Sequence, residues 1–303
     1  FRRTVTGFFD NLELFAQEAA KLSDAGAKGV YFTPNPVKSI PKVTPLNELR
    51  PATRGSATTD NDIENIRWLL VDIDPCRPSN VSATVAEKAA AERVCGHVAK
   101  YLQGLGWPNP LIGDSGNGYH LMYRLEGGTV ESNREVLDTL AFLFNTDEAK
   151  VDQLVFNPSR IWKVYGTHPK KGDSSDQRPH RKAALLNPTQ VVVPVSAQQQ
   201  SAFASALPMD APLDGDAGKT AELDTWVGEH FPLAEGPDPW AGRGRRWVFN
   251  VCPWDSSHTD RSAYVVQFNS GAIAAGCLHE ACEGQGKDDK GNALGWKRLQ
   301  KLA

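Results

Sequence analysis

Cysteine is scarce in this sequence, and it has no long hydrophobic run. Five cysteines in 303 residues are an odd number and too few for a disulfide scaffold. No apolar stretch approaches the roughly 18–20 residues of a membrane helix. The start, FRRTVTGFFDN, lacks the cationic-then-apolar order of a secretory signal. We therefore expect a cytoplasmic protein that does not bind a membrane.

The chain also lacks a strong excess of either charge, with 33 Lys+Arg against 36 Asp+Glu and a net charge of −3. As a total, this balance argues against a nucleic-acid partner, which usually requires a basic excess. The distribution removes that objection, because residues 210–240 carry eight acids and one base, and the rest of the chain is net +4. With 40% hydrophobic residues the chain can bury a core, so disorder is excluded as its dominant state.

Helical and strand patterns alternate irregularly through the first two thirds of the chain. Helices are predicted over residues 8–22, from a capping box at Thr84 and Glu87 to Gly106, and from a second capping box at Ser132 and Glu135. Strands are predicted at residues 29–32, 66–74, 111–113, 119–125 and 151–156. The order lacks the regular alternation of a doubly wound parallel sheet, so the predicted class is α+β.

A change of composition near residue 194 divides the chain. We expect a first domain over residues 1–193 and a small second domain over residues 221–303, which holds three of the five cysteines. Residues 194–220 are rich in Ser, Ala, Gln, Pro and Asp and show little apolar periodicity, which predicts a linker. We expect a monomer.

Asp72 and Asp74 end the buried apolar run IRWLLVDID. Because they are two residues apart on a predicted strand, their side chains leave the same face. Carboxylates on one rigid face suit Mg²⁺ or Mn²⁺, and two such ions about 3.5–4 Å apart can clamp the attacking and leaving oxygens of a phosphoryl displacement. The alternative is a strand end with two solvated acids.

The segment SGNGYH at residues 115–120 suits the triphosphate tail of a nucleotide. Its glycines let backbone N–H groups approach an anion, Ser115 adds a hydroxyl, and His120 adds a cation when protonated. Asn-Gly is also the strongest short hairpin signal and needs no ligand. A tight hairpin that presents Ser115 and His120 rigidly would satisfy both interpretations.

Residues 151–182 combine a third acid with a basic run. Asp152 can supply a third carboxylate, and Arg160 and Lys163 are spaced to project from neighbouring positions. Residues 160–182 contain seven Lys/Arg and two Asp, a net charge of +5 that suits phosphate. A solvated basic loop is the alternative, although cations nearby would relieve the repulsion among three carboxylates.

In their order, the motifs LLVDID, SGNGYH and VDQLVFNPSRIWKVYGTHPKKG resemble those of the archaeo-eukaryotic primase (AEP) superfamily. The resemblance covers about residues 25–190 and is greatest to the primase-polymerase modules of phage, plasmid and prophage primase-helicases. It implies an N-terminal αβ module packed on an RRM-like module, with the site in the groove between them.

The resemblance also implies roles for individual residues. The catalytic ligands of two Mg²⁺ or Mn²⁺ ions would be Asp72, Asp74 and Asp152. Nucleotide phosphates would be held by Ser115, Gly116 and the catalytic His120, and phosphate or template would be contacted by Arg160 and Lys163. Relatives of this type continue into a helicase, and this chain has no GxxxxGK[ST] loop. We therefore expect a helicase partner, in the same longer chain or in trans.

A second cluster lies near the C-terminus, in the pattern C-x5-H followed by C-x-H-x2-C. Zinc takes four thiolate or imidazole ligands in a tetrahedron, so five candidates are one too many. The preferred set is Cys252, His258, Cys277 and Cys282. Cys277 is preferred to His279 because a thiolate is the stronger ligand, and His279 is the alternate. We expect a structural zinc, as in the small zinc modules of phage primases that this segment resembles; scattered core cysteines are the alternative.

Residues 242–247, GRGRRW, combine guanidinium groups with an aromatic face that can stack on a base. A basic turn that ends in a core tryptophan is the alternative. The whole pattern predicts a DNA primase-polymerase that makes and extends primers on a single-stranded DNA template from dNTPs, rNTPs or both. The other hypotheses are a metal-dependent nuclease and a non-catalytic nucleic-acid-binding module of a replication or defence complex.

Overall fold

A computed structural model of the chain describes residues 4–38, 45–204, 207, 220–240, 242–279, 282, 284 and 295–303. Two compact units divide the chain, Phe1–Ser201 and Ala202–Ala303. Both contain helices and antiparallel sheet, so the predicted α+β class is confirmed. Among the described residues, none of the helices combines the length and the apolar character needed to cross a bilayer.

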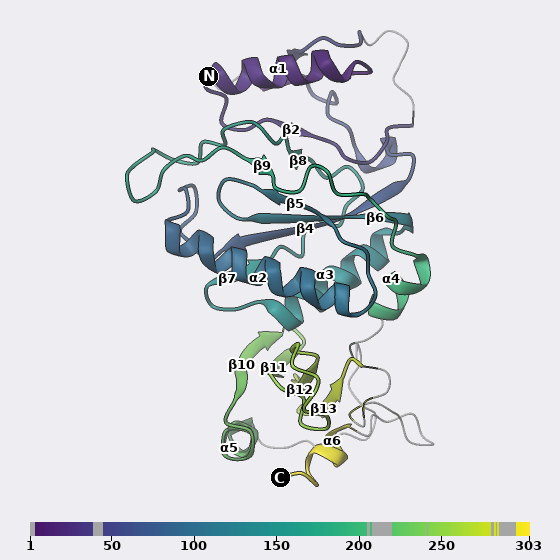
Figure 1. Cartoon of the computed structure of the whole chain (residues 1–303), viewed down its shortest axis with the longest axis vertical. Helices are drawn as coiled ribbons and strands as arrows, with labels where there is room; N and C mark the ends of the chain where they lie inside the picture. Colours follow the sequence, from purple (N-terminus) through teal and green to yellow (C-terminus); the bar gives the residue numbers. More distant parts are fainter. Residues whose placement is uncertain are drawn as a thin grey trace. The chain divides into compact units, whose positions relative to one another are not determined.

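A five-stranded sheet in which all neighbours are antiparallel forms the centre of the first unit. In spatial order its strands are β7 (Ala149–Val151), β4 (Ile66–Pro75), β6 (Tyr119–Gly128), β5 (Leu111–Asp114) and β9 (Ala184–Leu185). Two helices connect them, α2 (Val85–Gly104) and α3 (Val130–Phe144). The chain order β4-α2-β5-β6-α3-β7 is the βαββαβ connectivity of ferredoxin-like folds (Figure 1).

The residues of β4 alternate between the two faces of this sheet. Leu69, Val71 and Ile73 are fully buried, and α2 and α3 both pack against β4. In Figure 1 these two helices cover one face of the sheet. Because side chains alternate along a strand, Asp72 and Asp74 lie on the face away from Ile73.

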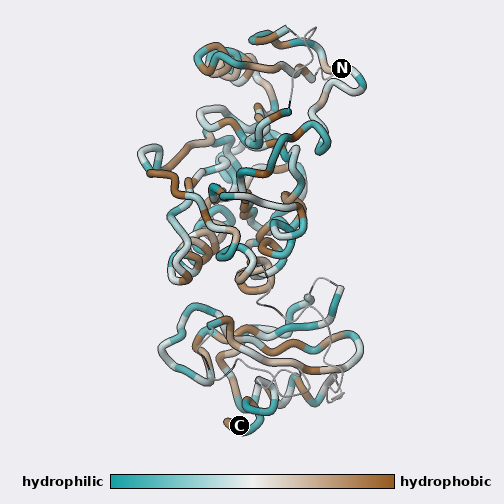
Figure 2. The backbone as a smooth tube through the Cα atoms, turned by 90° about the vertical axis from the view of Figure 1, so that its right-hand side faces the viewer, coloured by the Kyte–Doolittle hydropathy of each residue, from teal (hydrophilic) through white to brown (hydrophobic). Residues whose placement is uncertain are grey.

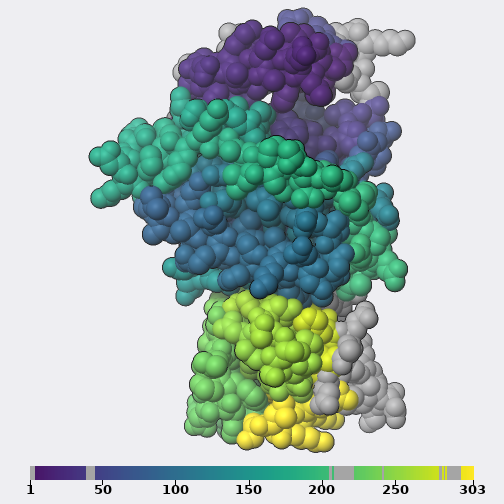
Figure 3. Space-filling view, in the orientation of Figure 1, coloured from purple at the N-terminus to yellow at the C-terminus, as the bar shows by residue number. Residues whose placement is uncertain are grey.

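Smaller elements complete the first unit. A two-stranded ribbon of β2 (Tyr31–Phe32) and β8 (Trp162–Lys163) packs through Trp162 on Leu70 and Met122 of the sheet. Figure 3 shows the teal segment that follows β8 lying between the purple N-terminal residues and the blue region around α2. The remaining elements are β1 (Val5–Thr6), α1 (Leu12–Asp24), β3 (Arg50–Pro51) and the 3-10 turn η1 (Asp60–Asp62).

Helix capping explains which predicted helix starts agree with the structure and which do not. The capping box of Thr84 and Glu87 opens α2 as predicted. The predicted box at Ser132 is wrong, because Thr129 is the N-cap of α3 and Ser132 is its third helical residue. The helix predicted from residue 8 begins only at Leu12, because the side chain of Asn11 caps its first turn.

The strand expected over residues 151–156 ends at Val151. The pairing does not continue beyond Asp152, because its Oδ1 accepts a hydrogen bond from the Leu154 N–H at 2.8 Å and forms a local turn.

The first part of the expected linker is ordered structure. Val195 is buried and pairs with β6, where the Glu126 N–H donates to its carbonyl oxygen at 3.0 Å. The helix α4 (Ala197–Ala204) follows, and the buried Gln200 side chain donates to Asn133 of α3 at 2.7 Å. These contacts use backbone groups and polar side chains, which apolar periodicity does not reveal. Most of residues 205–219 lie outside the described residues.

The second unit is built on a four-stranded antiparallel sheet in which strands adjacent in sequence are neighbours. Its strands are β10 (Ala234–Trp240), β11 (Gly244–Phe249), β12 (Ala263–Phe268) and β13 (Ile273–Cys277). The helices α5 (Thr220–His230) and α6 (Gly295–Leu299) complete it. Hydrophobic stretches run along this sheet in Figure 2. Trp247 and Trp296 belong to its core, together with three cysteines.

Candidate active site and candidate zinc site

Three of the predicted site residues lie side by side across the main sheet. Asp72 on β4 is paired with His120 on β6. On the other side, the Asp152 N–H donates to the Asp72 carbonyl oxygen at 2.8 Å and extends the β7 pairing by one residue. Directly opposed residues of antiparallel strands share a face. We call Asp152, Asp72 and His120 the Asp-His row.

Asp74 lies on the same face as this row, two residues beyond Asp72. Its Oδ1 is 3.2 Å from Nη2 of Arg77, a side chain that is only 7% exposed. The Nε of Arg77 is buried and has no hydrogen-bond partner among the described residues. Arg77 is therefore a built-in cation beside the carboxylate pair. No sequence pattern indicated it, although it follows Asp74 by only three residues.

The pKa values of the two carboxylates on β4, Asp72 and Asp74, are shifted in opposite directions. Burial raises the pKa of Asp72, but the hydrogen bond and charge of His120, with Lys171 and Lys163, outweigh it and lower the pKa overall. Burial and the negative charge of Asp72 raise the pKa of Asp74. The pair thus carries the electrostatic conflict that a bound cation would relieve.

Aromatic side chains enclose His120. Its ring is tilted against the Trp162 ring with centroids 4.1 Å apart. Its Nδ1 is 3.0 Å from the Tyr165 hydroxyl, and its Nε2 is 3.5 Å from Asp72 Oδ1. The imidazole is 5% exposed. Trp162 and Tyr165 were also missed, because only the tertiary fold brings them to His120.

The SGNG segment forms the predicted hairpin and uses its own polar groups. Ser115 Oγ accepts from the Gly118 N–H at 2.9 Å, and the Ser115 N–H donates to the Gly118 carbonyl oxygen. The Gly116 N–H donates to Asp114 Oδ1 at 2.7 Å. Gly116 has a φ of +92°, and a Cβ there would meet Pro169 Cγ at 2.8 Å. Ser115 and Gly116 therefore shape the hairpin, and these amides are engaged within it.

Lys163 and Arg160 occupy different surroundings. Lys163 is buried, donates to the Tyr31 hydroxyl at 3.0 Å, and contributes a positive charge to Asp72. Arg160 donates to the Leu154 carbonyl oxygen. It lines a pocket of about 460 Å³ with Leu154, Phe156, Asn157, Ser159 and Ile161. Lys171, which lowers the pKa of both Asp72 and Asp74, is the further cation of the Asp-His row.

The RPHR part of the basic loop is fixed to the start of α2. Arg178 makes a bidentate ion pair with Glu87, with both N···O distances 2.8 Å. Arg181 Nη1 donates to the Ala83 carbonyl oxygen at 2.7 Å. These two arginines are therefore attachments of the loop. Asn35 is likewise structural, since it bonds both the Pro158 carbonyl oxygen and the Arg67 N–H.

Three carboxylates of the kind that bind divalent cations lie at this part of the sheet, but their oxygens do not converge tightly. In the described part of the chain, Asp72, Asp74 and Asp152 do not form a group whose ligand atoms all lie within 4.8 Å of one another. Mg²⁺ usually keeps several waters and binds through one or two carboxylates. The donor chemistry of the three acids fits such a partly hydrated ion.

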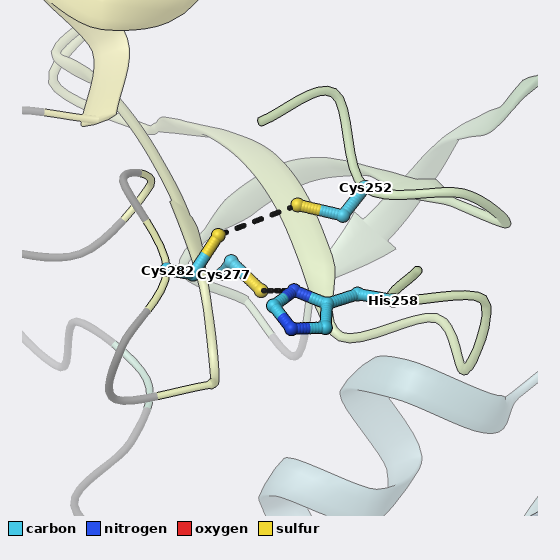
Figure 4. Close-up of side chains that lie close together, drawn as sticks. All are labelled: Cys252, His258, Cys277 and Cys282. Carbon is cyan, nitrogen blue, oxygen red and sulfur yellow. Dashed lines mark hydrogen bonds between the residues drawn. The ribbon is translucent and has the colours of Figure 1, made fainter. Parts of the chain in front are cut away.

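The second unit brings four of the five predicted zinc ligands together. The ligand atoms of Cys252, His258, Cys277 and Cys282 all lie within 4.8 Å of one another, and the three cysteines are buried. Figure 4 shows the three sulfurs and the imidazole pointing toward a common centre. Cys252 and His258 follow β11, Cys277 ends β13, and Cys282 follows it.

The spacing of these atoms fits a metal ion. Sγ of Cys252 is 3.6 Å from Sγ of Cys282, and Sγ of Cys277 is 3.7 Å from Nδ1 of His258. Zn–S bonds of about 2.3 Å in a tetrahedron place two sulfurs about 3.7 Å apart. The hydrogen bond between Cys252 and Cys277 lowers the pKa of the Cys277 thiol and raises that of Cys252, and burial raises the pKa of Cys282. A bound metal ion would favour the thiolate form of all three. The cluster could hold a structural metal such as zinc.

His279 lies beside these four residues. Its ring stacks on His258 with centroids 3.8 Å apart. Its Nδ1 is 3.6 Å from Cys277 Sγ, and its Nε2 is 3.2 Å from Asp260 Oδ2. The grouping of ligand atoms contains Cys277 and not His279. The geometry thus favours Cys277 as the fourth ligand, with His279 packed around the site.

The GRGRRW segment consists of a turn at residues 242–243 and the start of β11, an inner strand of the second sheet. Trp247 is 1% exposed, and Arg246 is 4% exposed with Asp238 at 3.7 Å. Arg245 makes two contacts of 2.8 and 2.9 Å with Asp224. The alternative of a basic turn that leads into a core tryptophan describes this segment better than a base-stacking surface.

Comparison with known proteins gives no relative for this chain: no family model, no curated protein and no solved structure matches it.

Proposed function

We propose that the first unit is the catalytic part of a primase-polymerase. It would join nucleoside triphosphates into a primer on a single-stranded DNA template and then extend it. The observation that carries this proposal is the Asp-His row with Asp74 beside it, on one face of an antiparallel sheet. The βαββαβ connectivity of that sheet supports the RRM-like module that the AEP resemblance implies.

Asp72, Asp74 and Asp152 would hold Mg²⁺ or Mn²⁺. Two such ions supply charge stabilisation for the attacking hydroxyl and the leaving pyrophosphate. In the proposed reaction the three acids would fix the position of the metal ions on this face of the sheet. His120 would bind a nucleotide phosphate through its nitrogen beside Asp72. Lys171 and Lys163, whose charges already act on Asp72, would neutralise the nucleotide phosphates. The hairpin amides are engaged internally, so cationic side chains would do most of the phosphate binding.

The second unit would hold a structural zinc and contribute to template or nucleotide binding. A helicase, in the same longer chain or in trans, would be the partner of the whole protein in replication. The zinc site is separate in sequence from the three acids, so the two metal functions can be removed independently.

Primer synthesis on single-stranded DNA tests the proposal. The full chain is incubated with template, Mn²⁺ and labelled dNTPs or rNTPs, and the isosteric variants Asp72→Asn and Asp152→Asn are compared with wild type. Both variants are expected to lose incorporation by at least about 100-fold, since each removes a metal ligand. The control is Asp147→Asn, an exposed acid in the turn before β7, which should keep full activity.

The same assay distinguishes the nuclease hypothesis from the primase-polymerase hypothesis. Degradation of labelled single-stranded DNA without any nucleotide, abolished in Asp72→Asn, would replace synthesis by hydrolysis as the function of these acids. Incorporation that survives in Asp72→Asn would end the primase-polymerase hypothesis, and degradation that survives in it would end the nuclease hypothesis. DNA binding without synthesis or degradation would leave the non-catalytic module.

A further inference from the structure

We propose that Tyr165 is the positioning residue of His120: its hydroxyl holds the neutral imidazole in the tautomer that carries the proton on Nε2. The consequence for nucleotide binding rests on the proposed function, whereas the tautomer itself is a property of the protein alone. Tyr165 lies within the motif VDQLVFNPSRIWKVYGTHPKKG, but neither the sequence pattern nor the resemblance gave it a role.

Each nitrogen of His120 faces a different partner. Nδ1 is 3.0 Å from the Tyr165 hydroxyl, and Nε2 is 3.5 Å from Asp72 Oδ1. A neutral imidazole has one N–H and one acceptor nitrogen, so the group that donates to one nitrogen decides where the proton lies. Asp72, as a carboxylate, can only accept.

Trp162 determines the direction of the Tyr165 hydroxyl. The indole Nε1 can only donate, and it is 3.2 Å from the Tyr165 oxygen. That oxygen therefore accepts from Trp162, and its own proton has two acceptors within reach, His120 Nδ1 at 3.0 Å and Met122 Sδ at 3.8 Å. A thioether is a weak acceptor, so the proton goes to Nδ1 and leaves the imidazole proton on Nε2.

The hydroxyl keeps its proton, because burial raises the pKa of Tyr165 and the negative charge of Asp72 raises it further, while the Trp162 hydrogen bond offsets only a part. Tyr165 is thus a donor across the whole neutral range.

Gly113 provides the room for this arrangement. It is paired with His120 across the β5–β6 ladder, and a Cβ atom at residue 113 would overlap the Tyr165 hydroxyl and ring. The phenol therefore occupies the space that a side chain at residue 113 would fill. Within the proposed function, the Nε2–H faces Asp72 and a phosphate oxygen bound beside it. The other tautomer would turn a lone pair toward these anionic oxygens.

Nitrogen-15 NMR of the histidine side chains tests the tautomer directly. The full chain, labelled at histidine and free of metal and nucleotide, is measured near pH 8.5, about two units above the ordinary histidine pKa. The His120 signals are assigned by their loss in His120→Gln. We expect a single Nε2–H form in wild type. In Tyr165→Phe the preference should weaken to a mixture of Nε2–H and Nδ1–H signals, because the Asp72 carboxylate at 3.5 Å then favours Nε2–H without the tyrosine hydroxyl.

Matched variants separate this effect from general damage. Gly113→Ala should reproduce the Tyr165→Phe spectrum by displacing the phenol. Tyr31→Phe removes a hydroxyl that bonds Lys163 on the same face and should leave the His120 signals unchanged. Gly127→Ala, on β6 with open space around it, should do the same. An Nδ1–H form in wild type overturns the proposal even if Tyr165→Phe fails to fold, and so does an unchanged tautomer in folded Tyr165→Phe.

Primer synthesis then distinguishes the two levels of the proposal. If the proposed function holds, Tyr165→Phe should raise the KM for the nucleotide about tenfold, the effect of one hydrogen bond, with a smaller change in kcat. A wild-type protein that shows the Nε2–H form but makes no primer would refute the function and leave the role of Tyr165 standing. An unchanged KM in active Tyr165→Phe would refute its contribution to nucleotide binding.

Discussion

Gly118 lies so close to Asp74 that a Cβ atom at residue 118 would be 3.1 Å from Asp74 Oδ1 and would overlap the Ile73 carbonyl oxygen. Because no side chain stands there, the start of β6 approaches the carboxylate end of β4. Gly118→Ala should push the two strands apart and lower the free energy of unfolding by about 1–3 kcal/mol. Urea denaturation measures this change. Gly127→Ala is the control and should stay within about 0.5 kcal/mol of wild type; equal stability of the two variants would contradict the prediction.

Asp74→Asn should make the protein more stable at neutral pH while abolishing activity. Burial and the charge of Asp72 raise the pKa of Asp74, so the folded state holds its proton more tightly than the unfolded state. The destabilisation of the fold therefore develops as the pH rises above the unfolded pKa, is complete above the raised folded pKa, and disappears at low pH. Urea denaturation in EDTA at pH 7 and near pH 3.5 should show a gain in the variant only at pH 7. A loss of stability at pH 7 would contradict the electrostatic conflict at this site.

Zinc should bind with one equivalent per chain and stabilise the second unit. Cys282→Ser should retain less than about half an equivalent, because it removes one of four ligands. His279→Gln should keep the stoichiometry but lose about 10–100-fold in affinity, as residues that surround a metal site do. Chelator competition and metal analysis give both quantities, with exposed Cys76→Ser as the control. Retention of zinc in Cys277→Ser together with its loss in His279→Gln would exchange the roles of these two residues.

The ion pair of Glu87 and Arg178 should contribute to stability only above acidic pH. The Arg178 hydrogen bond lowers the pKa of Glu87, so its stabilisation is present above the unfolded pKa and is lost as the pH falls through the folded pKa. Glu87→Gln should therefore flatten the acid side of a stability-versus-pH curve. Thermal unfolding between pH 3 and pH 7 measures it. The control is Glu131→Gln in the first turn of α3, and an equally steep acid limb in Glu87→Gln would refute the assignment.

Gln200→Ala should cost about 1–3 kcal/mol, since it leaves the buried Asn133 Oδ1 without its donor, while Asn133 Nδ2 keeps the Trp68 carbonyl oxygen. The exposed neighbour Gln198→Ala should change the free energy of unfolding by less than about 0.5 kcal/mol. Denaturation of the two variants compares them directly. A small effect at Gln200 would mean that the contact of α4 with α3 contributes little to the stability of the first unit.

Local patterns predicted much of this fold, because they depend on neighbours in sequence. The common face of Asp72 and Asp74 follows from strand alternation, and the Thr84 cap follows from spacing. The meeting of Gly113 with Tyr165 depends on a tertiary contact between distant segments, so no local pattern indicated it. The docking of Val195 on β6 was missed for the same reason. The hairpin shape at Ser115 was predictable, but the engagement of its amides required the hydrogen bonds themselves.

The strand β7 has only three residues and lies at the edge of its sheet, yet Asp152 follows it directly. An edge strand has one ladder neighbour, so it opens at lower free energy than the centre of a sheet. The amide of Asp152 should therefore exchange with solvent faster than that of Leu121, which is paired on both sides in the inner strand β6. In the Asp-His row, Asp72 and His120 then lie on inner strands, whereas Asp152 lies at an edge that opens locally. A divalent ion bound to Asp152 and Asp72 would slow that exchange. Metal binding and the pairing of Asp152 with β4 would then be thermodynamically coupled.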